Sequence, residues 1–219
     1  MGRWARPAGG RKSAAGRVAV RAESSAFRAA GCACRTLSGM PPTPPLPTPR
    51  LWLLPLTRPV VETRLRRETF LLPFDLGGQT VPVHFPSAWP GDLLPVFPMF
   101  LADLHFGRTD EVPGSWTLVE RASHTAVGTV GTKGEPDEAG LVEIGYGLTP
   151  EARGKGLMTE AGRAFLAHLL ARPDVRGVTA QTARGNRASE RVLEKLGFAR
   201  AGEGWSVEDG PLTVWTYAG

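Results

Sequence analysis

The feature that most constrains the fold is a turn with two glycines, residues 151–158 (Glu-Ala-Arg-Gly-Lys-Gly-Leu-Met). It joins a strand-like run that ends at Leu148 to a helix-like run that begins near Gly156. Glycines at a helix start leave backbone N–H groups unpaired and let a bulky anion approach closely. The helix dipole, Arg153 and Lys155 add positive potential. The turn predicts a diphosphate-binding loop, but not a P-loop, because no Ser or Thr follows Lys155.

Positive charge is concentrated at the N-terminal end of the chain. The 219 residues include 26 Lys and Arg and 21 Asp and Glu, which gives a net charge of +5. Residues 1–40 hold eight of the basic residues and one acid, so the rest of the chain carries a net charge of −2. A slightly acidic body gives no electrostatic reason to expect nucleic-acid binding by the core.

Residues 1–40 are predicted to be a disordered basic tail, because they are rich in Arg, Ala, Gly and Ser and lack an apolar period. Their Arg-rich, acid-poor composition is also typical of an organellar transit peptide. A translation start at Met40 would instead make them an upstream extension. Residues 41–49 (Pro-Pro-Thr-Pro-Pro-Leu-Pro-Thr-Pro) predict a stiff linker, because proline fixes φ. The folded domain is then expected at residues 50–219.

The cysteines and histidines give no metal or disulfide framework. Both cysteines, Cys32 and Cys34, lie in the tail, and although a Cys-x-Cys pair can bind metal, the lack of a second ligand pair favours incidental thiols. The four histidines are not at ligand spacing from one another, so no metal site is predicted. No run approaches 18 apolar residues, so no membrane span is expected. A reducing cytoplasm fits a cysteine-free body.

The body predicts strands and helices in a mixed α/β order. Its first half is expected to form a strand at 50–56, a helix at 60–67, a hairpin from 70–72 and 81–85, and a helix at 92–104 interrupted by prolines. Its second half is expected to form an antiparallel meander at 116–121, 125–132 and 140–148, a helix at 157–170, a parallel strand at 175–182, a helix capped by Asn186, and a final hairpin with a type I′ turn at Asp209-Gly210. The aromatic residues between Phe70 and Phe106 belong either to the core or to an acceptor pocket.

The strand at 140–148 has two different faces, because alternate side chains of a strand share a face. One face is apolar and carries Val142, Ile144, Tyr146 and Leu148. The other carries Glu143, Gly145 and Gly147. A carboxylate beside two glycines predicts an open groove for an extended ligand, with Glu143 at its end.

The strand that ends at Leu148, the turn at 153–156 and the run 186–198 (Asn-Arg-Ala-Ser-Glu-Arg-Val-Leu-Glu-Lys-Leu-Gly-Phe) resemble the GNAT superfamily of N-acetyltransferases, and within it the RimJ/RimL-like branch. That branch is named for ribosomal-protein N-terminal acetyltransferases, and the resemblance covers residues 50–218. It implies the GNAT acyl-CoA N-acyltransferase fold, a mostly antiparallel sheet with flanking helices whose parallel fourth and fifth strands splay apart. It also implies acetyl-CoA as co-substrate, bound by Leu148, Arg153, Gly154, Lys155, Gly156, Leu157, Met158 and Asn186.

The sequence departs from the family pattern at two places. Glu151 stands where the family often has Gln or Arg, and it is expected to face solvent. Many members place a Tyr on the last helix to protonate the departing thiolate, and here that position holds Leu193. The resemblance makes Ser189, one turn earlier, the candidate acid, whereas Tyr146 is expected to face the core.

Direct acetyl transfer requires a neutral amine to attack the thioester carbonyl. Glu143 is the predicted base, directly or through a water, and Ser189 or bulk water is the predicted proton donor to the thiolate. Each has a simpler alternative: Glu143 only attracts the acceptor ammonium, and Ser189 only completes the cap of Asn186. The acceptor is a peptide N-terminus or a small amine such as an antibiotic, polyamine or amino acid. A binding module without turnover and a homodimer also stay open.

Overall fold

The computed structural model describes residues 43–107 and 109–218, so the predicted tail and its two cysteines lie outside the described residues. The strands are β1 (Leu46–Pro47), β2 (Leu51–Thr57), β3 (Phe70–Asp75), β4 (Thr80–Phe85), β5 (Glu111–Glu120), β6 (Thr125–Thr132), β7 (Leu141–Leu148), β8 (Gly177–Ala183), β9 (Ala199–Ser206) and β10 (Gly210–Ala218). The helices are α1 (Arg58–Arg66), α2 (Phe97–Gly107), α3 (Leu157–Leu170) and α4 (Arg187–Leu196), with the short 3-10 helices η1 (Gly91–Val96) and η2 (Pro150–Ala152).

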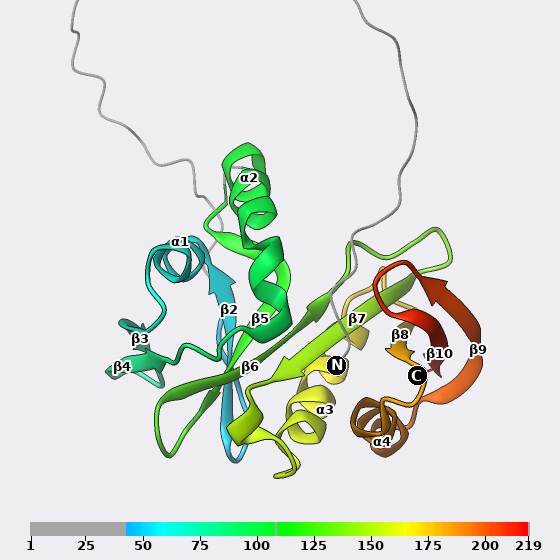
Figure 1. Ribbon diagram of the computed structural model, residues 1–219. Helices are drawn as coiled ribbons and strands as arrows, with labels where there is room; N and C mark the ends of the chain where they lie inside the picture. Colours follow the sequence, from blue (N-terminus) through cyan, green and yellow to red (C-terminus); the bar gives the residue numbers. More distant parts are fainter. Residues whose placement is uncertain (1–42, 108, 219) are drawn as a thin grey trace, which may run out of the picture.

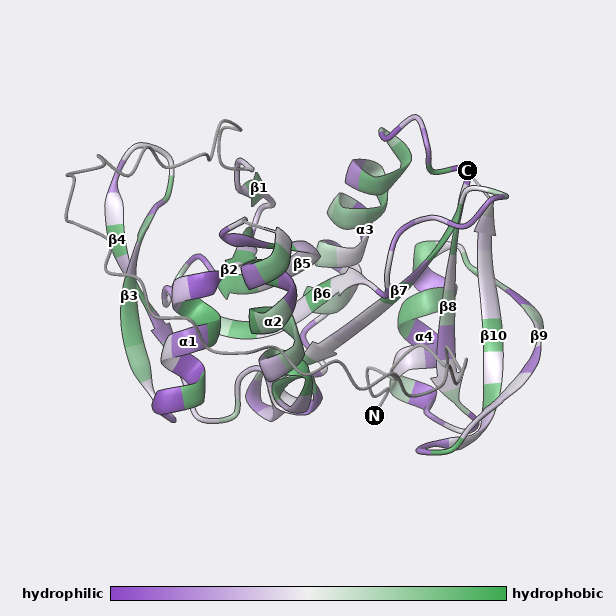
Figure 2. Cartoon of the chain, turned by 90° about the horizontal axis from the view of Figure 1, so that it is seen from above, coloured by the Kyte–Doolittle hydropathy of each residue, from purple (hydrophilic) through white to green (hydrophobic). Residues whose placement is uncertain are grey.

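The strands form one mixed sheet in the order β1-β2-β5-β6-β7-β8-β10-β9, and the β3–β4 hairpin joins it through β6 (Figure 1). The predicted α/β class, the antiparallel meander β5–β6–β7 and the parallel partner β8 are confirmed. In Figure 2 the half built from α1, α2 and the β3–β4 hairpin and the half built from β8, β10 and β9 lie at opposite ends, with β6 and β7 between them.

The last part of the predicted linker belongs to the sheet. Leu46 pairs with Leu53 and Pro47 with Trp52, so the linker prediction is corrected from residue 46 onward. Proline is tolerated there because β1 is an edge strand. Thr48, which follows, is buried, and its hydroxyl donates a hydrogen bond to Glu160 Oε1 at 2.6 Å. The folded domain therefore begins before Arg50.

The parallel strands β7 and β8 separate halfway along β7. Their pairing runs from Leu141 opposite Gly177 to Ile144 opposite Ala180, and β7 continues to Leu148. The second half of β7 still pairs with β6 on its other edge. The edge of β7 that faces β8 therefore has no strand partner after Ile144 within the described chain. This confirms the predicted splay, and Figure 1 shows the two strands diverging.

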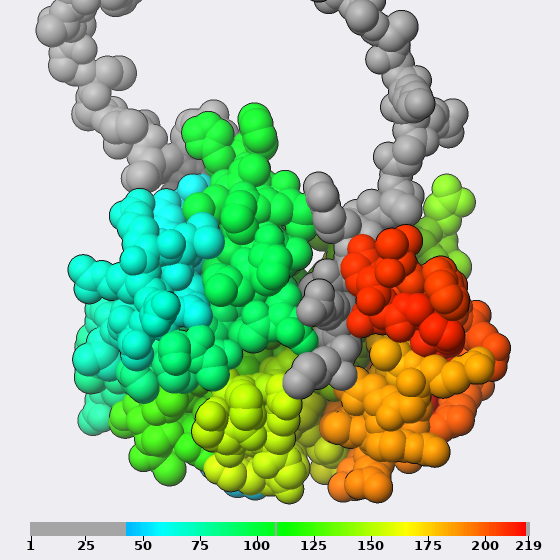
Figure 3. All heavy atoms as spheres, viewed as in Figure 1, coloured from blue at the N-terminus to red at the C-terminus, as the bar shows by residue number. Residues whose placement is uncertain are grey.

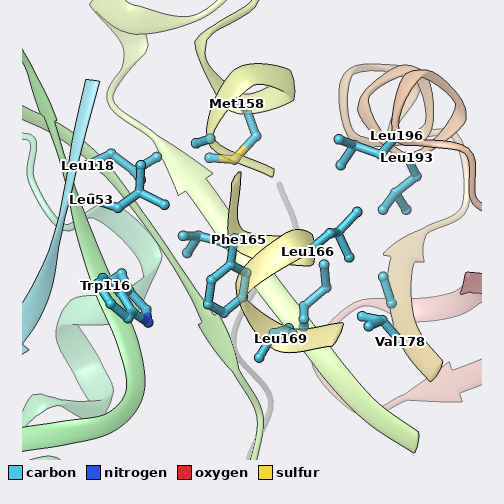
Figure 4. Packing of buried hydrophobic residues seen from close by; sticks show 14 of the residues in the cluster. Leu53, Trp116, Leu118, Met158, Phe165, Leu166, Leu169, Val178, Leu193 and Leu196 are labelled. Atoms are coloured by element: carbon cyan, nitrogen blue, oxygen red, sulfur yellow. The ribbon is translucent and has the colours of Figure 1, made fainter. Parts of the chain in front are cut away.

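Helix α3 packs against one face of the sheet, and its apolar side chains form the larger core there (Figure 4). Phe165 is fully buried near Trp116, and burial of a side chain of this size contributes about 2 kcal/mol. On the other side of the helix, Leu166 points toward α4. An added Cβ at Gly162 would lie 2.7 Å from Leu196 Cδ1, so glycine there lets α4 approach α3 closely. This contact fixes α4 beside the start of α3.

A second core lies on the opposite face of the sheet, under α1, η1 and α2. The aromatic residues predicted for either core or pocket are largely core here. Phe85 stacks on Phe70 with ring centroids 4.6 Å apart and meets the edge of Trp89 at 4.8 Å. Trp89 is fully buried, and its indole N–H donates to the Gly128 carbonyl at 3.1 Å. That bond attaches the segment before η1 to β6.

The final hairpin is present, but the predicted type I′ turn is wrong. Ser206 pairs with Gly210, so three residues rather than two connect β9 to β10. A type I′ turn needs positive φ at both central residues, and of the pair Asp209-Gly210 only Gly210 has it, with φ of 69°. The Asp209 N–H instead donates to Ser206 Oγ at 2.8 Å. The loop thus ends in a left-handed glycine.

Candidate functional site

A cavity of about 640 Å³ lies where β7 and β8 diverge. Four parts of the chain line it: residues 88–93, the strand residues Thr129 and 146–148, the turn with the start of α3, and α4. In Figure 3 the surface of α3, in yellow, lies between the green surface of α2 and the orange surface of α4. The site therefore collects residues from both halves of the molecule.

The glycine turn has the geometry that its sequence predicts. Gly154 and Gly156 both have φ of +75°, a left-handed conformation that glycine adopts without strain. Gly156 is the N-cap of α3 and offers no side-chain cap to the first N–H groups of the helix. An added Cβ at Gly154 would meet no atom within 4 Å, so the space over the turn is open. Glu151 is exposed, as predicted.

Arg50 holds this turn from outside. Its Nη1 donates to the Lys155 carbonyl at 2.9 Å, and its Nε donates to Glu160 Oε2 at 2.6 Å. Burial disfavours ionisation of Glu160, but hydrogen bonds from Thr48 and Arg50 outweigh burial and lower the pKa of this carboxyl. Lys155 contributes its backbone to this contact and does not line the cavity. The turn thus depends on residues about a hundred positions earlier in the chain.

Asn186 lies in the cavity with half of its amide unused. As predicted, it caps α4, and its Oδ1 accepts a hydrogen bond from the Ser189 N–H at 3.3 Å. Its Nδ2 is buried and has no hydrogen-bond partner among the described residues. Leaving such a donor unpaired costs about 1–3 kcal/mol. Because Asn186 lines the cavity, this unpaired amide nitrogen belongs to a residue of the cavity wall.

Ser189 and Tyr146 meet at the same wall. Both line the cavity, and the Tyr146 hydroxyl donates to the Ser189 carbonyl at 3.1 Å. Burial raises the pKa of the Tyr146 phenol above its ordinary value, so the phenol stays protonated at neutral pH. The prediction that Tyr146 faces the core holds only in part, because its ring packs on the core and also borders the cavity.

Glu143 lies apart from the other predicted site residues. It does not line the cavity, and it precedes Gly147 by four residues of strand, about 13 Å. Both of its carboxylate oxygens already have donors: Lys133 Nζ lies 2.6 Å from Oε1, and Gln181 Nε2 lies 3.1 Å from Oε2. Lys133, which follows β6, and Gln181 of β8 thus hold the Glu143 side chain outside the cavity, and its role as base stays a prediction.

The remaining predicted residues gather as expected. Those that line the cavity are Leu148, Arg153, Gly154, Gly156, Leu157, Met158, Asn186 and Ser189. The Leu148 carbonyl accepts a hydrogen bond from Arg153 Nε at 3.2 Å, which ties the end of β7 to the turn. The turn, the strand end and the helix cap thus form one continuous wall.

Five polar lining residues were not predicted from the sequence: Asp92, Thr129, Thr159, Arg191 and Lys195. Arg191 and Lys195 follow Ala188 at helical spacing on one face of α4, and that period could have identified them. Thr129 and Asp92 carry no local signal, because folding brings β6 and η1 to the cavity. Among the described lining residues Asp92 is the only acid, whereas the cations come from the turn and α4.

Within the described residues, no group of three or more His, Cys, Asp or Glu side chains is arranged to hold a metal ion. None of the helices in those same residues is long and apolar enough to cross a membrane.

Residues 99–199 match the model of the acetyltransferase (GNAT) domain. Among curated proteins, the "Uncharacterized N-acetyltransferase YjdG" of Bacillus subtilis (strain 168) is 34% identical over 111 residues, or 50% of this chain. The match spans 66% of that relative, slightly less than two thirds of its length.

Solved structures share the fold at low sequence identity. The ribosomal-protein-S5-alanine acetyltransferase of Vibrio fischeri aligns with a TM-score of 0.54 and 17% identity over 80% of this chain and 97% of its own. The coenzyme A complex of RimL, a ribosomal L7/L12 alpha-N-protein acetyltransferase, aligns with a TM-score of 0.55 and 14% identity over 80% of this chain and 98% of its own. These likenesses establish a common architecture.

Proposed function

We propose that this protein transfers the acetyl group of acetyl-CoA directly to a primary amine, because residues 99–199 match the model of the acetyltransferase (GNAT) domain. The observation that carries the proposal is the unpaired Asn186 Nδ2, which borders the same cavity as the open glycine turn. A donor for a carbonyl and a cradle for a diphosphate at one cavity match the pantetheine amides and the pyrophosphate of coenzyme A.

Each part of the donor site has a proposed role. The backbone N–H groups of the turn at 153–158 bind the pyrophosphate, helped by the α3 dipole. The unpaired edge of β7 after Ile144 offers backbone groups to the pantetheine arm. Asn186 Nδ2 donates to a carbonyl of that arm. Acetyl-CoA supplies the activated thioester.

In the reaction, the amine nitrogen forms a bond to the acetyl carbon while the carbon–sulfur bond breaks. Starting from the ammonium form, the nitrogen gives up two protons to solvent, one before the attack and one after it, and the departing sulfur gains one. We assign the proton donor to Ser189, which lines the cavity. Tyr146 positions it, because the phenol donates to the Ser189 carbonyl. Glu143 is not assigned as base, because both of its oxygens are engaged outside the cavity.

For the acceptor we favour a peptide or protein N-terminus, as in the RimJ/RimL-like branch. Two enzymes of this fold are named for ribosomal proteins that they acetylate. A polycationic small molecule would need several carboxylates, and Asp92 supplies the only carboxylate in the described lining. A small monoamine is the second candidate, because one carboxylate also suits it.

An acceptor screen tests the proposal. Calorimetry first measures coenzyme A binding, and thiol release is then followed with acetyl-CoA and peptides of varied N-terminal residue, amino acids, polyamines and aminoglycosides. Thiol release with peptides alone supports the N-terminal activity. Coenzyme A binding without thiol release for any acceptor would identify a binding module. Failure to bind coenzyme A would overturn the donor assignment.

A further inference from the structure

The two ends of the cavity differ in charge. Arg153, Arg191 and Lys195 border the end formed by the turn and α4. Residues 88–93 form the other end, where Asp92 is the only acid in the described lining. Opposite charge at opposite ends suits an anionic donor and a cationic acceptor that meet in the middle.

Asp92 is held in place by the backbone around it and has no partner of its own. Its neighbour Leu93 is buried, and the buried Trp89 indole bonds to the Gly128 carbonyl at 3.1 Å. The Asp92 side chain is exposed, and none of the ion pairs among the described residues involves it. A fixed backbone thus presents a carboxylate that has no ion-pair partner in the described part of the chain.

Thr129 supplies a second polar group at this end. It follows Gly128, the residue that holds Trp89, and it pairs with Gly147 on β7. Thr129 is 1% exposed and lines the cavity, and its Oγ1 has no hydrogen-bond partner in the described part of the chain. A hydroxyl buried without a partner is unfavourable unless a ligand, a water or a neighbouring group pairs with it.

The space in front of these groups is empty and has apolar walls. An added Cβ at Gly147 would meet no atom within 4 Å. Ala88, Pro90 and Leu93 line the cavity nearby. The pocket can therefore accept an apolar group next to the charged atom of its ligand.

We propose that Asp92 and Thr129 form the binding site for the acceptor amine, and that they select a primary monoamine with an apolar substituent over a polycation. This inference rests on the proposed function. Asp92 supplies the counter-charge to the ammonium, and Thr129 Oγ1 accepts a hydrogen bond from its N–H. A single carboxylate cannot neutralise several ammonium groups, so a polycation gains less from this site.

The structure offers a matched control for each residue. Asp103 is an exposed aspartate on the neighbouring helix α2 and does not line the cavity. Thr117 pairs with Thr129, is 2% exposed, and also has an unpartnered Oγ1, but it does not line the cavity. Asp92→Asn is therefore compared with Asp103→Asn, and Thr129→Val with Thr117→Val.

The experiment measures binding of leucinamide, N-acetyl-leucinamide and spermidine to the coenzyme A-saturated protein by calorimetry. We expect Asp92→Asn to weaken leucinamide binding about tenfold and Thr129→Val about fivefold, while both control variants bind like the wild type. N-acetyl-leucinamide, which is neutral, should bind at least about tenfold more weakly than leucinamide. Coenzyme A affinity should stay unchanged in all four variants.

Equal leucinamide affinity in each variant and its control would overturn the inference, as would spermidine binding more tightly than leucinamide or an absence of leucinamide binding. The outcome is separable from the proposed function. Asp92-dependent amine binding without thiol release leaves the amine site standing and removes the transferase. Thiol release from acetyl-CoA that neither Asp92→Asn nor Thr129→Val changes would keep the transferase and remove the amine site.

Discussion

Asn186 and Ser189 are joined by one hydrogen bond that uses only half of the Asn186 amide. Oδ1 accepts the Ser189 N–H at 3.3 Å to cap α4, and Nδ2 is buried beside the cavity without a partner in the described chain. One side chain thus serves two separable purposes, helix stability through its oxygen and ligand binding through its nitrogen.

Asn186→Asp separates the two purposes. Aspartate caps a helix as well as asparagine does, so the free energy of unfolding should change by less than about 0.5 kcal/mol. The donor is lost, so coenzyme A affinity should fall at least about tenfold. Asn186→Ala should lower both affinity and stability, the latter by about 1 kcal/mol. Urea denaturation measures the free energy of unfolding, and calorimetry measures coenzyme A affinity. An unchanged affinity in Asn186→Asp would show that Nδ2 does not bind coenzyme A.

Glu143→Gln should leave turnover within about threefold of the wild type, because Glu143 is bound to Lys133 and Gln181 outside the cavity. A catalytic base would instead lose about 100-fold on this substitution. The measurement is kcat/KM from pH 6 to 9 for both proteins. A large loss that shrinks at high pH would restore Glu143 as the base.

Tyr146→Phe should change the pH dependence of stability in alkali. The folded state raises the pKa of Tyr146 above its ordinary value of 10.0, mainly through burial. Below pH 10 both states are protonated and the stabilisation is complete. Above pH 10 the unfolded chain loses this proton first, so wild-type stability falls. Tyr146→Phe has no phenol to ionise, so its stability does not fall for this reason. The melting temperature of the wild type should therefore approach that of Tyr146→Phe as pH rises above 10. A constant difference would contradict it.

Glu160→Gln should loosen the glycine turn, because Glu160 joins Thr48 and Arg50 to the start of α3. The Arg50 side chain of this ion pair is about half exposed, so the loss of stability at neutral pH should be about 1 kcal/mol. The folded state lowers the Glu160 pKa below 4.5, so this stabilisation is present above pH 4.5 and lost as pH falls. Thermal melts at pH 3 and pH 7 should show the mutant closer to the wild type at pH 3.

The local elements were predictable where one segment carries the whole signal. The glycine turn, the cap at Asn186 and the faces of α3 all follow from neighbouring residues, since backbone conformation and helical period act over a few positions. The type I′ turn failed because Asp209 does not adopt positive φ, a choice between turn types that Asp-Gly alone leaves open.

The acceptor end of the site could not be predicted in this way. Asp92 reaches the cavity because Trp89 bonds to Gly128, which is 39 residues away in sequence. Thr129 is one of three threonines in β6, and only the fold shows that its hydroxyl has no partner in the described chain. The partners of Glu143 could not be predicted for the same reason, since Lys133 and Gln181 reach it from separate segments.

The end of pairing at Ile144 makes β7 a strand with two different halves. Residues 141–143 are paired with β8, Ile144 is paired with both β8 and β6, and residues 145–148 are paired with β6 alone. A pantetheine arm lying along the open edge would act as a substitute strand, so the sheet becomes continuous only in the complex. Amide hydrogen exchange should then slow within residues 145–148 when coenzyme A is added, and stay unchanged in residues 141–144.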